Sequence, residues 1–255
     1  MTITAKTFDN YATGYADKFN RNPLGIYQRE RVQAELAPYL QPGTAVLDVG
    51  CGPGSDFAFY RSKNMTIDAM DISEKMVELA RETAANLGLS ATVSHCDLLD
   101  FWTGKTYDVI VLNFGVINAM ADADAALEKL QHLLKPNGVL AIVAMPPFHL
   151  FSALGDFLSL RLRTVYRRII LKKLNLANGM TVRYFAKNTF LRHFELIKKI
   201  NLCAVLPTPD QYQQSVFARS IAKMLLPVDR AIAERIPDAF GGDHVCYLLK
   251  KVCNG

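Results

Sequence analysis

Short apolar runs alternate with stretches of helical periodicity along the first 148 residues. Apolar and β-branched side chains predict strands over residues 44–50, 65–71, 91–97, 107–113 and 138–145. Between them, apolar residues at spacings of three and four predict helices after Pro53, over residues 73–87 and over residues 124–134. Strands that alternate with helices are typical of a parallel, doubly wound sheet, so the pattern predicts an α/β fold.

Helical periodicity also precedes the first strand. Apolar residues from Phe8 to Phe19 fall on one helical face, and Asn22-Pro23 interrupts this pattern. A second apolar stripe runs from Leu24 to Leu40. We therefore expect residues 1–43 to form helices that lead into the sheet.

The regular alternation ends after Pro147. Residues 150–174 are predicted as one amphipathic helix, and residues 211–236 as a further helical stretch. Residues 195–206 and 244–252 are two strand-like runs on either side of that stretch. We expect them to complete a mostly parallel, seven-stranded sheet as an antiparallel pair at its edge.

Composition excludes several classes of protein. The chain has 255 residues, of which 50% are hydrophobic and 21% charged, as in ordinary globular proteins and unlike disordered or fibrous ones. Its five cysteines are scattered without a C-x-x-C spacing, so we expect no disulfide framework, no metal site and a cytoplasmic location. Residues 136–155 lack charge, but Pro146-Pro147 interrupts them, which favours a buried strand and turn over a membrane span.

Charge is distributed unevenly along the chain. Residues 1–148 carry 12 basic and 17 acidic side chains, residues 149–176 carry 6 and 1, and residues 177–255 carry 11 and 6. A basic back half fits an anionic partner such as a phosphate, a membrane surface or a nucleic acid, and it equally fits an ordinary solvated surface.

The glycine-rich segment VLDVGCGPG, residues 46–54, lies between a predicted strand and a predicted helix. Gly50 and Gly52 would let a ligand lie against the backbone at the carboxyl end of the strand, where open α/β sheets bind ligands. Asp48 precedes Gly50 by two residues and Gly52 by four. Its negative charge would attract the ammonium group of a ligand and repel a pyrophosphate.

Two more acidic residues follow predicted strand ends. Asp71 lies where a nucleoside-binding α/β fold places a carboxylate for the ribose hydroxyls. The Asp97 carboxylate can accept a hydrogen bond from an adenine amine, and the Leu98 backbone N–H can donate to a ring nitrogen. His95, two residues before Asp97, either lines that site or packs in the core.

Together these motifs resemble the class I S-adenosylmethionine-dependent methyltransferases over residues 8 to about 145. The resemblance implies S-adenosylmethionine as cofactor, with Asp48 near the methionine ammonium, Ile72 against the adenine and Asn113 beside the methionine. It further implies that Tyr15 and Arg29 close over the cofactor. The implied division is lid helices over 1–43, a cofactor-binding core over 44–148, a cap with the sixth strand over 149–243 and a final strand over 244–255.

Methyl transfer needs an aligned nucleophile and, for an acidic O–H or N–H, an acceptor for its proton. Position at the rim of the sheet or in the lid nominates His149 and Tyr11 for that role. The D/N/S-P-P-Y motif of base-modifying amino-methyltransferases is missing after the fourth strand, where the sequence is NFGVIN. We therefore expect an O or N nucleophile on a small or lipid-like, possibly anionic, molecule. RNA methylation and a non-catalytic, cofactor-binding regulator are the alternatives.

The basic helix predicted over residues 150–174 has two interpretations. Its apolar face either packs as a cap over the substrate, which we favour, or rests on an anionic membrane. The sequence does not predict an oligomeric state.

Overall fold

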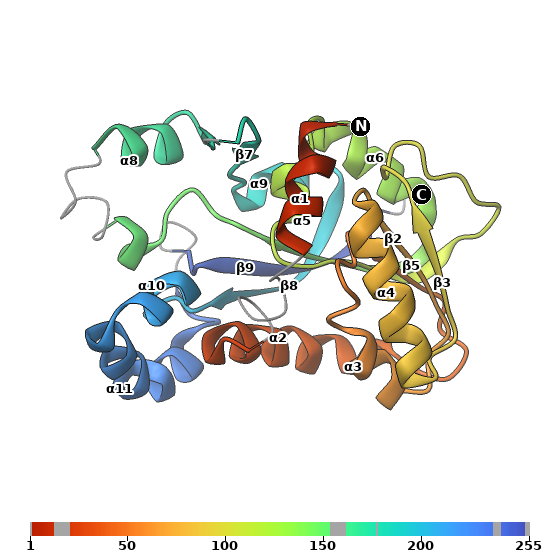
Figure 1. Ribbon diagram of the computed structural model, residues 1–255, viewed down its shortest axis with the longest axis horizontal. Coiled ribbons are helices and arrows are strands. Elements are labelled where there is room, and N and C mark those ends of the chain that lie inside the picture. The colour runs from red at the N-terminus through yellow and green to blue at the C-terminus, as the bar shows by residue number, and fades with distance from the viewer. Residues whose placement is uncertain (1, 13–20, 154–161, 177, 237–240, 253–255) are drawn as a thin grey trace.

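The computed structural model describes residues 2–12, 21–153, 162–176, 178–236 and 241–252 (Figure 1). Seven strands form one sheet in the order β3-β2-β1-β4-β5-β9-β8. β1 to β5 are parallel to one another, β9 runs antiparallel beside β5, and β8 runs antiparallel beside β9. The strands are β1 Val46–Val49, β2 Ile67–Asp71, β3 Ala91–His95, β4 Tyr107–Leu112, β5 Leu134–Ala144, β8 Phe194–Leu202 and β9 His244–Lys251. The predicted α/β fold and its antiparallel edge pair are confirmed.

Helices cover both faces of the sheet (Figure 1). One core cluster joins the sheet to α2, α3 and α4, and a second joins it to α6 and α9. The helices are α1 Ile3–Ala12, α2 Pro23–Leu36, α3 Phe57–Ser62, α4 Glu74–Leu87, α5 Val116–Ala119, α6 Ala123–Leu133, α8 Leu162–Ile169, α9 Lys187–Leu191, α10 Pro209–Gln214 and α11 Val216–Ile232. A short 3-10 turn, Ala37–Tyr39, follows α2.

Local sequence explains where two of these helices begin. Asn22 caps α2 by accepting hydrogen bonds from the backbone N–H groups of Leu24 and Gly25, and Pro23 fills the first helical position. Ser73 caps α4 in the same way through the N–H of Met76. The first cap fixes where the N-terminal segment enters the fold, and the second lies directly after β2.

The segment after β5 departs from the single helix predicted over residues 150–174. Residues 150–153 are helical, residues 154–161 lie outside the described residues, and α8 ends at Ile169. Lys172 then adopts a left-handed backbone with φ of 50°, and β6, Lys173–Asn175, pairs with β7, Thr181–Arg183. The prediction was wrong at this end, because a left-handed residue cannot continue a right-handed helix. The stretch predicted over 211–236 divides into α10 and α11 at Ser215, which caps α11.

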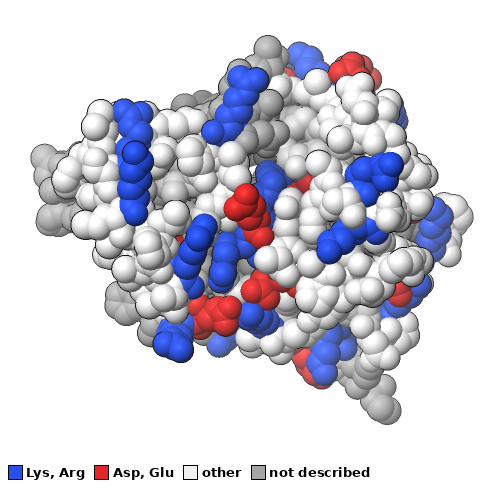
Figure 2. Space-filling model, turned by 90° about the horizontal axis from the view of Figure 1, so that it is seen from below, with Lys and Arg blue, Asp and Glu red and all other residues white. Residues whose placement is uncertain are grey.

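Within the described residues, no helix has both the length and the apolar character needed to cross a bilayer. Figure 2 shows acidic and basic side chains interspersed over the lower face of the molecule. Ion pairing accounts for part of the basic charge in the back half, because Lys198 pairs with Glu35 at 3.1 Å and with Glu234 at 3.0 Å. On the part of this face that the structure describes, basic side chains lie among acidic ones and do not form a continuous positive surface of the kind that nucleic-acid binding uses.

Candidate cofactor and substrate site

A cavity of about 220 Å³ opens at the carboxyl ends of β1, β2 and β4, and α1 covers it with Thr4 and Phe8. It is lined by seven of the residues that the sequence nominated, namely Gly50, Gly52, Asp71, Ile72, Asp97, Leu98 and Asn113. These residues come from four separate segments of the chain. The parallel sheet brings them together because its strands end at one edge.

The glycine loop holds a left-handed backbone above β1. Gly50 and Gly52 have φ of 68° and 55°, and the N–H of Gly50 donates to the carbonyl of Met70 at 2.8 Å. A Cβ on Gly50 would stand 2.5 Å from the Val116 side chain, whereas a Cβ on Gly52 would meet no atom within 4 Å. Gly50 is therefore needed for packing, and Gly52 keeps a space in the cavity free.

Asp71 connects this loop to α4. Its carboxylate accepts hydrogen bonds of 2.9 Å from the backbone N–H groups of Gly52 and Ser73. Burial raises the pKa of Asp71, and those two hydrogen bonds oppose the rise. A carboxylate has about four acceptor positions, so two remain for hydroxyl groups of a ligand.

A buried polar cluster lies under the other end of the cavity. Asp56 accepts hydrogen bonds from Arg29 at 2.6 Å and from Asn113 at 2.8 Å. Asp48 is 2% exposed beside this cluster, and burial, together with the charge of Asp56, raises its pKa well above the usual value while Arg29 opposes the rise. The Oδ1 atom of Asn113 is buried without a hydrogen-bond partner. This end of the cavity therefore offers an unmet acceptor and excess negative charge to a cation such as an ammonium.

Several other nominated residues have other surroundings or lie outside the described residues. Arg29, expected to close over the cofactor, pairs with Asp56, and its guanidinium lies 4.8 Å from the centre of the Phe114 ring. Tyr11 is 43% exposed on α1 and does not line the cavity, while Tyr15 lies outside the described residues. His95 contacts the Ile72 carbonyl at 3.1 Å.

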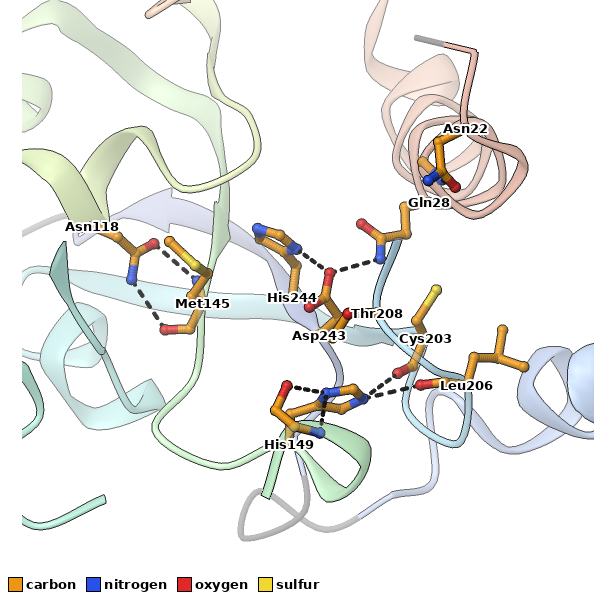
Figure 3. Close-up of polar contacts among 12 residues, drawn as sticks. Asn22, Gln28, Asn118, Met145, His149, Cys203, Leu206, Thr208, Asp243 and His244 are labelled. Carbon is orange, nitrogen blue, oxygen red and sulfur yellow. Dashed lines mark hydrogen bonds and ion pairs between the residues drawn. The ribbon is translucent and has the colours of Figure 1, made fainter. Parts of the chain in front are cut away.

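His149, nominated as a proton acceptor, is 1% exposed and does not line the cavity either. Its Nε2 lies 3.0 Å and 3.2 Å from the carbonyl oxygens of Cys203 and Leu206, and its Nδ1 lies 2.9 Å from the Ser152 hydroxyl (Figure 3). Because Nε2 faces two acceptors, it carries the proton, and Nδ1 accepts. Burial lowers the pKa of His149, so this neutral ring joins the start of the cap to the loop after β8.

The sequence did not nominate several residues that complete the cavity, such as Phe8, Met76 and Phe114. Phe8 could have been found from the helical periodicity that it shares with Tyr11. Phe114 follows β4 with φ of 51°, a backbone conformation that the sequence pattern does not reveal for a bulky residue.

Comparison with known proteins agrees with this geometry. A family model described as a methyltransferase domain matches residues 40–157. A demethylmenaquinone methyltransferase of Bacteroides fragilis is 30% identical over 176 residues, which cover 66% of this chain and 67% of the relative. The chain belongs to the class I S-adenosylmethionine-dependent methyltransferases. A ubiquinone/menaquinone biosynthesis C-methyltransferase UbiE of Hydrogenovibrio crunogenus is 29% identical over 143 residues, which cover 53% of this chain and 56% of that relative.

Solved structures share the fold at low sequence identity. The 1,6-didemethyltoxoflavin-N1-methyltransferase of Burkholderia thailandensis, crystallised with 1,6-didemethyltoxoflavin and S-adenosylhomocysteine, has a TM-score of 0.64 and 15% identity, covering 98% of this chain and 88% of that one. The N-methyltransferase NodS of Bradyrhizobium japonicum, in complex with S-adenosylhomocysteine, has a TM-score of 0.56 and 12% identity, covering 98% and 99%.

The cofactor of this family is S-adenosylmethionine, and the cavity has the features that it requires. Asp71 retains acceptor positions for two ribose hydroxyls, and Asp97 and Leu98 line the part of the cavity expected to hold the adenine. The resemblance implies that the methionine would lie near the space above Gly52 and the free Oδ1 of Asn113. The cavity is thus polar where the sugar and the amino acid would lie.

Proposed function

We propose that the protein methylates a small apolar ring molecule that carries an acidic O–H or N–H, such as the hydroquinone form of a quinone. The observation that carries this proposal is the apolar cluster beside the cavity, formed by Met180, Val182 and Tyr184. Phe8 and Ala119 pack against that cluster and also line the cavity. An acceptor that reaches the cofactor from this side would lie between apolar surfaces, as a flat ring does.

S-adenosylmethionine, when bound, supplies a methyl group on a positively charged sulfur. The protein's residues would bind and orient the two reactants and exclude water, which suffices for an in-line displacement once the acceptor has lost its proton. A ring hydroxyl that loses its proton places negative charge on the oxygen and on the neighbouring ring carbons. The same deprotonation therefore prepares the oxygen acceptor expected from the sequence and the carbon acceptor implied by the names of the relatives.

A labelling experiment tests this proposal. The protein is incubated with radiolabelled S-adenosylmethionine and demethylmenaquinol, and in parallel with cell extract separated into organic, small polar and RNA fractions. Label in demethylmenaquinol or in the organic fraction is the expected result. Label in RNA would support RNA methylation instead, and cofactor binding without any turnover would support a non-catalytic regulator.

The protein also has a surface suited to peripheral contact with the inner face of a cytoplasmic membrane, and we propose this location. Tyr166, Ile170 and Leu171 are 54%, 61% and 45% exposed. Arg167 and Lys172 are exposed beside them. Apolar side chains flanked by basic ones complement a bilayer that contains anionic lipids, and such a surface would bring a lipid-like substrate near the enzyme.

A further inference from the structure

A partly buried histidine–aspartate pair stands at the start of the last strand. β9 runs antiparallel to β5, and Val245 pairs with Ala144, the last residue of β5. The beginning of β9 therefore lies at the edge of the sheet where the parallel strands end and where the cavity opens. His244 and the preceding Asp243 are placed at this edge, although 95 residues separate His244 from His149, the nominated histidine.

The pair has a defined hydrogen-bond arrangement (Figure 3). Asp243 Oδ2 lies 3.0 Å from His244 Nδ1 and 3.0 Å from Gln28 Nε2, which reaches it from α2. Burial, the largest single influence, raises the pKa of Asp243, but His244 and the other neighbouring polar groups together hold that pKa well below its usual value. Asp243 is therefore an ionised carboxylate that can only accept, so Nδ1 of His244 carries a proton.

The other ring nitrogen of His244 lies near Gly115, a lining residue of the cavity, although His244 is not itself among the lining residues. Nε2 lies 3.9 Å from the point where a Cβ on Gly115 would stand, and the sulfur-bound methyl group of Met145 lies 3.0 Å from the same point. Gly115 lines the cavity, and Met145 packs against the apolar cluster proposed to hold the acceptor. The ring of His244 also meets the edge of Phe114, another lining residue, at 5.7 Å between centres.

The backbone beside Nε2 has an uncommon conformation. Phe114 and Gly115 both have left-handed backbones, with φ of 51° and 84°. For a phenylalanine this conformation is costly, and such strain gathers at functional sites. A Cβ at position 115 would stand 3.0 Å from the Met145 methyl group and 3.9 Å from Nε2, so a larger side chain there would crowd the region between Nε2 and the cavity.

We propose that His244, oriented by Asp243, accepts the proton of the methyl acceptor. The O–H or N–H bond of the acceptor breaks, its electron pair stays on the acceptor, and a new N–H bond forms at Nε2. The deprotonated acceptor would then take the methyl group that bound S-adenosylmethionine supplies, and, where a ring carbon is the attacking atom, that carbon loses its hydrogen as a proton and the oxygen regains one. The imidazolium, stabilised by Asp243, gives its proton to water. This inference rests on the proposed function, and it assigns to His244 the role for which sequence position had nominated His149 and Tyr11.

The kinetic test compares His244→Ala with His132→Ala, which changes an exposed histidine of α6. Since general bases contribute about 100-fold or more, we expect kcat for demethylmenaquinol to fall about 100-fold in His244→Ala, with the Kd for S-adenosylmethionine unchanged. Added imidazole should restore part of the lost kcat, which a purely structural role of His244 would not allow. His132→Ala should retain the parental kcat.

Asp243 is a positioning residue in this proposal, and Asp243→Asn provides a second variant. It should lower kcat while leaving KM for demethylmenaquinol close to the parental value, because the neutral amide does not stabilise the imidazolium. Parental kcat in folded His244→Ala, or loss of kcat without rescue by imidazole, would overturn the inference.

A measurement without substrate separates this inference from the proposed function. In protein labelled with ¹⁵N at histidine, nitrogen NMR should show the His244 proton on Nδ1 in the parent and its redistribution in Asp243→Asn. A proton on Nε2 of the parent would overturn the inference for any substrate. If the parent does not methylate demethylmenaquinol but shows the Nδ1 proton, the substrate assignment fails, and the kinetic comparison is repeated on the extract fraction that takes up label.

Discussion

The Ser73 hydroxyl donates a 2.6 Å hydrogen bond to the Asp9 carboxylate, and both side chains are buried. Ser73 is the N-cap of α4, and Asp9 lies on α1, which covers the cavity. The N–H of Lys75 also points to Asp9, at 3.4 Å. The covering helix α1 is therefore attached to the N-terminus of α4, which follows Asp71 in the chain. A helix N-terminus favours a carboxylate such as that of Asp9, because the helix dipole is positive there.

Removing this attachment should loosen the cover without changing the cofactor's own contacts. We expect Asp9→Ala to raise the Kd for S-adenosylhomocysteine about fivefold to tenfold, because one hydrogen bond is worth about 1 kcal/mol. The change should appear mainly as faster dissociation in stopped-flow measurements. Asn10→Ala, at an exposed position of the same helix, is the control, and equal dissociation rates in the two variants would contradict the attachment.

Asp71 should contribute directly to cofactor affinity. Loss of two ribose hydrogen bonds to a charged acceptor predicts that Asp71→Ala weakens S-adenosylmethionine binding by about 2 to 4 kcal/mol in calorimetry. The same change frees the N–H groups of Gly52 and Ser73, so the melting temperature should also fall. Asp68→Ala is the matched control on β2, because Asp68 pairs with Lys105 outside the cavity. Unchanged affinity in Asp71→Ala would remove Asp71 from the cofactor site.

Gly52 allows a test that separates backbone strain from cavity space. Gly52→Val should abolish cofactor binding, because its side chain enters space that is free of protein atoms. Gly43 has a comparable φ of 87°, is exposed and likewise has no atom within 4 Å of its Cβ position. Gly43→Val should therefore carry the same strain, about 1 to 2 kcal/mol, and still bind the cofactor. Normal binding by Gly52→Val would show that the loop is only a turn.

The sheet and the convergence of the nominated strand ends on one cavity could be predicted from the sequence, because both depend on local order along the chain. A stretch of ten residues of sequence is enough to recognise a buried strand, a glycine loop or an acidic residue at a strand end. Asp48, Gly52 and Asp71 were each found from such a stretch. The parallel topology then brings those strand ends together.

Contacts between distant segments could not be predicted in this way. His149 is buried because Cys203 and Leu206, more than 50 residues away, place carbonyl oxygens around it. Arg29 pairs with Asp56, a partner that no local pattern indicates. The site of His244 depends on the antiparallel direction of the last strand, which brings the start of β9, rather than its end, to the cavity.

Asp48 should destabilise the protein in the absence of cofactor. Folding raises the pKa of the Asp48 carboxyl above its value in the unfolded chain. The contribution of Asp48 to the free energy of unfolding is therefore fully present below the unfolded pKa and is lost as the pH rises through the folded pKa. Asp48→Asn removes this loss. We expect the cofactor-free variant to melt higher than the parent at pH 8, with a difference that shrinks as the pH falls toward 4.

The same substitution should weaken S-adenosylmethionine binding, because it removes negative charge near the expected ammonium. Higher stability combined with lower affinity would show that Asp48 is retained for ligand binding at the expense of stability. If Asp48→Asn melts below the parent at pH 8, the carboxylate stabilises the cluster with Arg29 and Asp56 instead. Thermal melts at pH 5 and pH 8, with calorimetry at pH 8, provide both measurements.

The surface around α8 gives the last prediction. A basic residue near an anionic bilayer contributes about 1 kcal/mol to binding, so replacing Arg167, Lys172 and Lys173 with Gln should weaken association with phosphatidylserine vesicles by about 3 kcal/mol, roughly 100-fold. Two other basic residues of this segment are unsuitable, because Arg161 lies outside the described residues and Arg168 stacks on Tyr184 at 5.0 Å. Those two are therefore left unchanged.

Cofactor affinity should not change in the triple variant, and the vesicle association of the parent should decline with added salt, because the attraction is screened over about 10 Å at 0.1 M. A control variant replaces three exposed basic residues elsewhere, Arg61, Lys105 and Arg192, with Gln. If both variants lose the same affinity, the attraction depends only on net charge, and the surface around α8 has no special part in it. If the parent does not bind vesicles but the triple variant shows a higher KM for an anionic substrate, these side chains act on the substrate, as a cap over it would.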